Sequence, residues 1–222
     1  MQLFTSPNNS RELKRDISLY RQRRNYTCGP SSVMMVMSAL DPQFTPNEVS
    51  ELEIWREATT IHGGCGPVGL ALALDRRKFR SKIIVNHDDL FLGSRASRKE
   101  EIEAMRLLQA RDMAEARDRS IEIAVQNYTL EDLTTWMTEG WHPIVMIGIE
   151  YEGINITHWI VITGIGSGGL LVNDPLKDVN MPDGPSLIDY QTFAEISSFG
   201  ERRERAVVLA GIREPESRPT IR

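Results

Sequence analysis

The stretch "RQRRNYTCGPSSVMMVMSAL", residues 21–40, decides the fold, because a cysteine stands directly before a long apolar run. The run from Ser31 to Leu40 is too long and too apolar for an exposed strand, and a proline suits the first turn of a helix. We therefore expect a buried helix that begins near Pro30. A Cys28 thiol at that helix start would lie among unpaired backbone N–H groups, which favour a negative charge and lower a thiol pKa.

Composition and charge describe an ordinary globular chain. It has 222 residues with 41% hydrophobic and 26% charged residues, enough for one domain with a substantial core. The formal net charge of −5, with both signs mixed along the chain, argues against nucleic acid as the main partner. The N-terminus "MQLFTSPNNSRELKRD" lacks the apolar core of a secretory signal, and no stretch approaches the length of a membrane span. These features predict a cytoplasmic protein.

The sequence also argues against a structural metal or a disulfide framework. The two cysteines, Cys28 and Cys65, are widely separated. The four histidines show no CxxC or HxxxH spacing of the kind that zinc sites use. We expect no metal and no organic cofactor.

Helical patterns dominate the first two-thirds of the chain and strands the last third. Helices are expected after Thr45 as N-cap with Pro46 as first residue, after Pro67, within 97–120 and within 127–140; the charges of 97–120 suit a solvated face. Strands are expected in "SKIIVN", "HPIVMIGIEYEG", "ITHWIVITGIGSGG", "LLVNDP" and "RAVVLAGI". This segregation predicts an α+β fold in which an N-terminal helical layer packs on a C-terminal, mostly antiparallel sheet.

The expected organisation is one domain with two short flanks. An N-terminal extension covers residues 1–20, and the domain covers 21–213, with a helical part at about 21–140 and a sheet part at about 141–213. Residues 214–222 form a polar tail.

Three further residues could complete a thiol site. His158 stands at the start of an apolar strand, and Asp174 ends the next strand, so an antiparallel pair joined by "GIGSGG" could bring them together. Gln22 precedes Cys28 by six residues, close enough for its amide to face the sulfur. Each residue also has an ordinary structural interpretation: core packing for the cysteine, a satisfied histidine, and a turn at "NDP". Their order and spacing together favour nucleophilic catalysis.

Cys65 is a competing thiol, because it also precedes Gly-Pro in "HGGCGP". No glutamine lies six residues before it, and His62 is too near in sequence to be a spatially assembled partner. We interpret this segment as a glycine-rich turn near the site or the core, with substrate contact or a second-thiol role as alternatives. No role is assigned to His87 or His142.

The blocks "QRRNYTCGPSSVMMV", "THWIVITGI" and "LLVNDP" together resemble the double-glycine leader peptidases, the bacteriocin-processing members of the papain-like cysteine peptidases. The resemblance implies a papain-like fold in which Cys28 is the nucleophile, His158 the base and acid, Asp174 the orienting carboxylate and Gln22 the oxyanion donor. It implies a peptide or protein substrate and hydrolysis of a peptide or isopeptide bond through a thioester. The chain is similar to stand-alone bacterial members without the ABC transporter, some of them found beside acetyltransferases, so an acetyltransferase is a candidate partner.

Three other functions use the same sequence features. A thioester-using acyltransferase would pass the acyl group to an acceptor other than water. A non-catalytic papain-like domain would bind a leader peptide without cutting it. A structural or regulatory partner of another enzyme would dock through the charged helix at 95–119. Thiol reactivity separates the catalytic from the binding functions, because only a catalytic Cys28 needs a pKa below its ordinary value of about 8.5.

Overall fold

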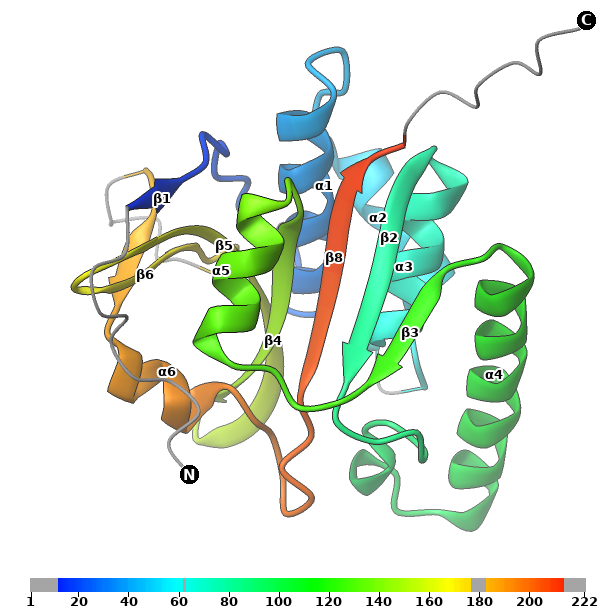
Figure 1. The fold of residues 1–222 in the computed structure, drawn as a ribbon. Coiled ribbons are helices and arrows are strands. Elements are labelled where there is room, and N and C mark those ends of the chain that lie inside the picture. The colour runs from blue at the N-terminus through cyan, green and yellow to red at the C-terminus, as the bar shows by residue number, and fades with distance from the viewer. Residues whose placement is uncertain (1–11, 62, 177–182, 214–222) are drawn as a thin grey trace, which may run out of the picture.

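One eight-stranded sheet organises the computed structural model of the chain, which describes residues 12–61, 63–176 and 183–213 (Figure 1). The strands run in the order β3-β2-β8-β4-β5-β6-β7, and β1 pairs with β5. Only β2 and β3 pair in parallel, so the sheet is mostly antiparallel. The strands are β1 (Leu13–Lys14), β2 (Phe79–Val85), β3 (Glu122–Val125), β4 (His142–Tyr151), β5 (Ile154–Gly166), β6 (Gly169–Asn173), β7 (Ser186–Ile188) and β8 (Ala206–Ile212).

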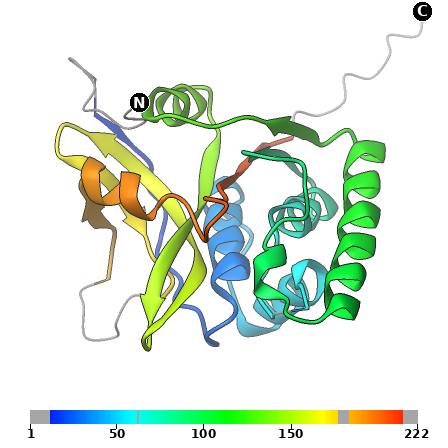
Figure 2. The same cartoon turned by 90° about the horizontal axis from the view of Figure 1, so that it is seen from below.

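Helices cover both faces of this sheet. Figure 2 shows α1 and α5 on opposite sides of it, and α4 stands at the edge beyond α3. The helices are α1 (Cys28–Leu40), α2 (Glu48–Ala58), α3 (Pro67–Arg76), α4 (Lys99–Asp118), α5 (Leu130–Thr138), α6 (Tyr190–Ile196) and the short 3-10 helix η1 (Gly93–Arg95).

The central strands are apolar on both sides because both sides are covered. On β4, β5 and β8, residues Ile144, Trp159 and Val208 face the cluster formed with α1 and α3. Their chain neighbours Val145, Ile160 and Val207 face a second cluster with α5 and α6. This double burial explains why these strands appear in the sequence as continuous apolar runs rather than alternating ones.

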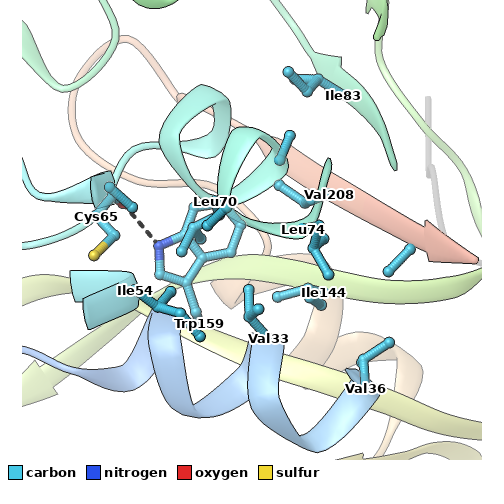
Figure 3. Close-up of a cluster of buried hydrophobic side chains, with 14 of the residues drawn as sticks. Val33, Val36, Ile54, Cys65, Leu70, Leu74, Ile83, Ile144, Trp159 and Val208 are labelled. Atoms are coloured by element: carbon cyan, nitrogen blue, oxygen red, sulfur yellow. Dashed lines mark hydrogen bonds between the residues drawn. The ribbon is translucent and has the colours of Figure 1, made fainter. Parts of the chain in front are cut away.

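Helix α1 lies at the centre of the first cluster. Every residue from Cys28 to Met37 is buried, so the helix is enclosed rather than amphipathic. The indole of Trp159 on β5 lies between α1 and α3, against Leu70, and donates from Nε1 to the carbonyl of Cys65 at 3.0 Å (Figure 3). This packing fixes the start of α1 against β5.

The predicted α+β class is confirmed, and some local predictions are not. The helix expected from Pro46 begins at Glu48, with Asn47 rather than Thr45 as its N-cap. The Asn47 side chain accepts a hydrogen bond from the N–H of Ser50, and asparagine is among the most favourable N-cap residues. Strands β3 and β7 and helix α6 were not expected, because each is too short for its periodicity to stand out.

Several predictions fall on residues outside the described part of the chain. They are the polar tail at 214–222, His62, and residues 1–11 of the N-terminal extension. The described end of that extension joins the sheet, where Leu13 pairs with Ile165 and Lys14 with Gly164.

Gly169 controls the turn between β5 and β6. It has a φ of 140°, and a Cβ at this position would lie 2.2 Å from the carbonyl oxygen of Ile188. We expect Gly169→Ala to lower the free energy of unfolding by at least about 2 kcal/mol, through backbone strain and this clash. Urea denaturation followed by circular dichroism measures the change.

Gly168→Ala is the matched control, since a Cβ there would make only an ordinary contact of 3.8 Å with Leu187. We expect this variant to stay within about 0.5 kcal/mol of the wild type. Equal effects of the two substitutions would contradict the role given to Gly169.

Candidate active site

Cys28 is the first residue of α1, two residues before Pro30. Its N-cap, Thr27, makes no side-chain capping hydrogen bond, so the first N–H groups of the helix stay available. The backbone N–H groups of Gly29 and Trp159 both interact with the sulfur. The residue is buried, with 7% of its surface exposed.

His158 and Asp174 come together across the β5–β6 hairpin. The register places Val161 opposite Asn173, and an irregularity follows between Ile162 and Gly164. Asp174 therefore leaves β6 beside His158, and its Oδ1 lies 2.6 Å from His158 Nε2. The same carboxylate oxygen accepts a hydrogen bond from the N–H of Leu176, which holds it in place.

The imidazole of His158 bridges this carboxylate and the Cys28 thiol. Because Nε2 faces Asp174, Nδ1 is the ring nitrogen that remains for the interaction with Cys28. Burial opposes the charged form of the ring, but the negative charges of Cys28 and Asp174 outweigh it and raise the pKa of His158. Burial likewise opposes ionisation of Cys28, but the His158 charge and the hydrogen bonds to the sulfur lower the pKa of the thiol.

Gln22 lies in the loop before α1. Its backbone N–H donates to the carbonyl of Pro175 at 3.0 Å, so the loop lies against the segment that follows Asp174. Its side-chain Nε2 donates to the carbonyl of Arg24 at 2.9 Å. An amide has two N–H groups, so this contact leaves one of them for another acceptor.

A buried carboxylate that the sequence analysis missed holds this loop. Glu51 on α2 is 0% exposed. Its oxygens accept a hydrogen bond from the Tyr20 hydroxyl at 2.9 Å and one from the Arg23 N–H at 2.9 Å, and they contact the Thr27 hydroxyl. Glu51 thus fixes both ends of the segment that carries Gln22 to Cys28. Its position within an amphipathic helix gave no sign of this role.

Cys65 lies in the core, near the start of α1. It is 3% exposed, and its Cβ would lie 3.2 Å from a Cβ added at Gly29. Burial, followed by the nearby charge of Cys28, raises the pKa of the Cys65 thiol well above its ordinary value. This environment keeps the thiol neutral, and it agrees with the interpretation of "HGGCGP" as a turn next to the core and the site.

The remaining histidines lie apart from these residues. His142 is buried on β4, and burial followed by the charge of Arg15 lowers its pKa to about 4. His87 lies 3.5 Å from the carboxylate of Glu204. It borders an apolar pocket between α3, β2 and α4 whose lining does not include Cys28, His158 or Asp174.

The described part of the chain offers neither a metal-binding cluster nor a membrane-spanning helix. In residues 12–61, 63–176 and 183–213, no group of three or more His, Cys, Asp or Glu residues is placed to hold a metal ion. Within the same ranges, no helix combines the length and the apolar character needed to cross a membrane.

Loss of the Glu51 carboxylate should loosen the loop before Cys28. We expect Glu51→Ala to lower the free energy of unfolding by about 3 kcal/mol, because it leaves buried donors without an acceptor. Glu53→Ala is the matched control, since Glu53 is exposed on the same helix, and it should change stability by less than about 0.5 kcal/mol. Chemical denaturation of both variants compares them, and a Glu51 variant as stable as the control would refute the role of the carboxylate.

Comparison with known proteins identifies the family. The model of the family described as "Peptidase_C39 like family" matches residues 17–211, and no curated protein matches the chain. Among solved structures, the peptidase domain of Streptococcus ComA, a bifunctional ABC transporter involved in quorum sensing, is 14% identical with a TM-score of 0.47. That match covers 89% of this chain and 99% of the ComA chain.

A double glycine motif protease from an AMS/PCAT transporter, solved in complex with the leader peptide, is 12% identical with a TM-score of 0.47. This match covers 89% of this chain and 94% of the protease. The match to the family model spans nearly the whole described domain, and it agrees with the resemblance that the Cys28, His158 and Asp174 blocks carry. The chain therefore belongs to the Peptidase C39-like family.

Proposed function

We propose that this protein is a cysteine peptidase that hydrolyses a peptide or isopeptide bond through Cys28, His158 and Asp174. The observation that supports the proposal best is the His158 ring, which stands between the Cys28 thiol and a carboxylate 2.6 Å from its Nε2. A thiolate and an imidazolium form when the thiol proton moves to the ring. The carboxylate orients the ring and stabilises its positive charge.

In the first half of the reaction, the Cys28 sulfur attacks the carbonyl carbon of the substrate, and a C–S bond forms. The negative charge moves to the carbonyl oxygen, where the backbone N–H of Cys28 and the free amide N–H of Gln22 would donate to it. His158 then gives its Nδ1 proton to the leaving amine, the C–N bond breaks, and an acyl-enzyme thioester remains.

In the second half, His158 takes a proton from a water molecule that attacks the thioester. The tetrahedral intermediate collapses, the C–S bond breaks, and the carboxylic acid product leaves. The proton returns to the thiol–imidazole pair. Every proton and leaving group is handled by side chains of this chain.

The substrate of this reaction is a peptide or protein. A leader peptide ending in two glycines is one candidate, given the family to which the chain belongs. Neither the structure nor the matched proteins support the acetyltransferase partner that the resemblance implied, and it forms no part of the proposal.

The thiol–imidazole pair predicts a distinctive pH dependence of alkylation. Only the thiolate reacts, and because the pKa of Cys28 is lowered, iodoacetamide should label Cys28 rapidly at pH 6. The positive charge of His158 offsets the effect of burial on the pKa of Cys28. Because His158→Ala removes this charge, labelling at pH 6 should slow on the order of 100-fold. Mass spectrometry of the labelled peptides measures each site separately.

Cys65 serves as an internal control in the same experiment. Its raised pKa and its burial should keep it unlabelled until the protein unfolds. If Cys28 labels only above about pH 8, as an unperturbed thiol does, the catalytic proposal is wrong and a binding domain becomes the better hypothesis.

A peptide library tests the activity itself. Cys28→Ala should abolish cleavage, whereas Cys65→Ala should retain it. Gln22→Ala should lower kcat by about 10²- to 10³-fold, the usual effect of losing one oxyanion donor. Cleavage products are identified by mass spectrometry, and equal product patterns from wild type and Cys28→Ala would exclude this chain as the peptidase.

A further inference from the structure

Arg95 ends the 3-10 helix η1 in the segment between β2 and α4, far in sequence from the proposed catalytic residues. Its Nη1 donates to the hydroxyl of Thr157 at 3.0 Å. Thr157 directly precedes His158 on β5. The guanidinium is therefore hydrogen-bonded to the strand residue next to the proposed base.

The same group also lies near the turn that contains Gly64. Arg95 Nη1 lies 3.6 Å from the position that a Cβ would take at Gly64. The neighbouring Cys65 packs against Gly29 at the start of α1. The turn that contains "GGCGP" therefore spans from Arg95 to the residue that follows Cys28.

The guanidinium is close enough to Cys28 for their charges to interact. Burial lowers the pKa of Arg95, and a thiolate at Cys28 opposes that effect. Arg95 thus lies within the electrostatic field of the proposed nucleophile, although η1 contributes no residue to the thiol–imidazole–carboxylate chain.

The charge of Arg95 has no carboxylate counter-ion in the described part of the chain. No carboxylate there forms an ion pair with it, and its hydrogen bond goes to a neutral hydroxyl. By contrast, Arg77 is likewise partly buried, and it forms an ion pair with Glu57. A partly buried, unpaired cation is costly, and a ligand carboxylate would satisfy it through charge-assisted hydrogen bonds.

We propose that Arg95 binds a carboxylate of the substrate residue that adjoins the scissile bond. This inference rests on the proposed peptidase function and names its substrate class: peptides with an acidic side chain or a terminal carboxylate beside the bond that Cys28 attacks. The guanidinium offers several N–H donors in one plane, so the contact with Thr157 leaves others for a carboxylate.

Two alkylating reagents of similar size test this directly. Iodoacetate carries a carboxylate and iodoacetamide does not, and both react with the Cys28 thiolate by the same displacement of iodide. We expect Arg95→Gln to lower the ratio of their rate constants at Cys28 about tenfold at pH 7 and low salt. The charge of His158 acts on iodoacetate in both proteins, so the comparison isolates Arg95.

Two further variants control for charge and for general effects. Arg95→Lys keeps a positive charge and should restore part of the ratio. Arg106→Gln removes an exposed arginine of α4 that lies 3.6 Å from Asp89, and it should leave the ratio unchanged. Thermal unfolding confirms that the variants compared are folded.

The outcomes separate this inference from the proposed function. A lowered ratio in Arg95→Gln alone supports the carboxylate site. Equal slowing by both reagents means that Arg95 only stabilises the thiolate, and it overturns the inference while leaving the peptidase proposal intact. A wild-type Cys28 that reacts with neither reagent overturns both.

The source of the carboxylate is distinguished with longer reagents. N-Bromoacetylglycine carries a terminal carboxylate, and the α-amide of N-bromoacetylaspartate carries a side-chain carboxylate. Their neutral counterparts are N-bromoacetylglycinamide and the α-amide of N-bromoacetylasparagine. If one acid alkylates Cys28 faster than its neutral counterpart and this difference depends on Arg95, that acid identifies the source of the carboxylate. If neither acid reacts faster than its neutral counterpart, the proposed substrate class is wrong.

Discussion

The rest of the site depends on one buried histidine, whose two ring nitrogens each need an interaction partner. His158 is 2% exposed, and a buried ring nitrogen without a partner is costly. Nε2 obtains its partner from β6, through Asp174, and Nδ1 obtains its partner from the start of α1. The hairpin register and the position of α1 thus both bear on this one side chain.

The two Cys-Gly-Pro segments show that the same residues can have opposite chemistry. Helix α1 begins at Cys28 itself, whereas α3 begins at Pro67, two residues after Cys65. The Cys28 sulfur therefore interacts with the N–H of Gly29 and with an imidazole, whereas Cys65 uses its carbonyl to bind Trp159. Burial, followed by the charge of Cys28, raises the pKa of the Cys65 thiol and keeps it neutral. Helix register and one charged neighbour account for the difference between the two thiols.

The candidate site residues that the sequence predicts lie at positions that the local sequence pattern determines. An apolar run after Cys-Gly-Pro indicates a helix start, and two apolar runs around a glycine turn indicate a hairpin, so Cys28, His158 and Asp174 could be predicted. Glu51 and Arg95 could not, because each belongs to the site only through tertiary packing. A buried glutamate in α2 and a loop arginine look in sequence like the exposed charges around them. The same limit applies to β3, which joins the sheet through parallel pairing with β2.

The arrangement of charge around Cys28 explains why both hidden residues matter. Asp174 places negative charge on the far side of the imidazole, and Arg95 places positive charge on the side of the Gly64 turn. A substrate carboxylate would be attracted by Arg95 and repelled by Asp174, so the proposed carboxylate site favours one orientation of the substrate. Glu51 holds the loop of Gln22 by accepting from the N–H of Arg23. Under the proposal, substrate selection and catalysis come from different segments, since Arg95 belongs to the connection between β2 and α4 and reaches β5 only through Thr157.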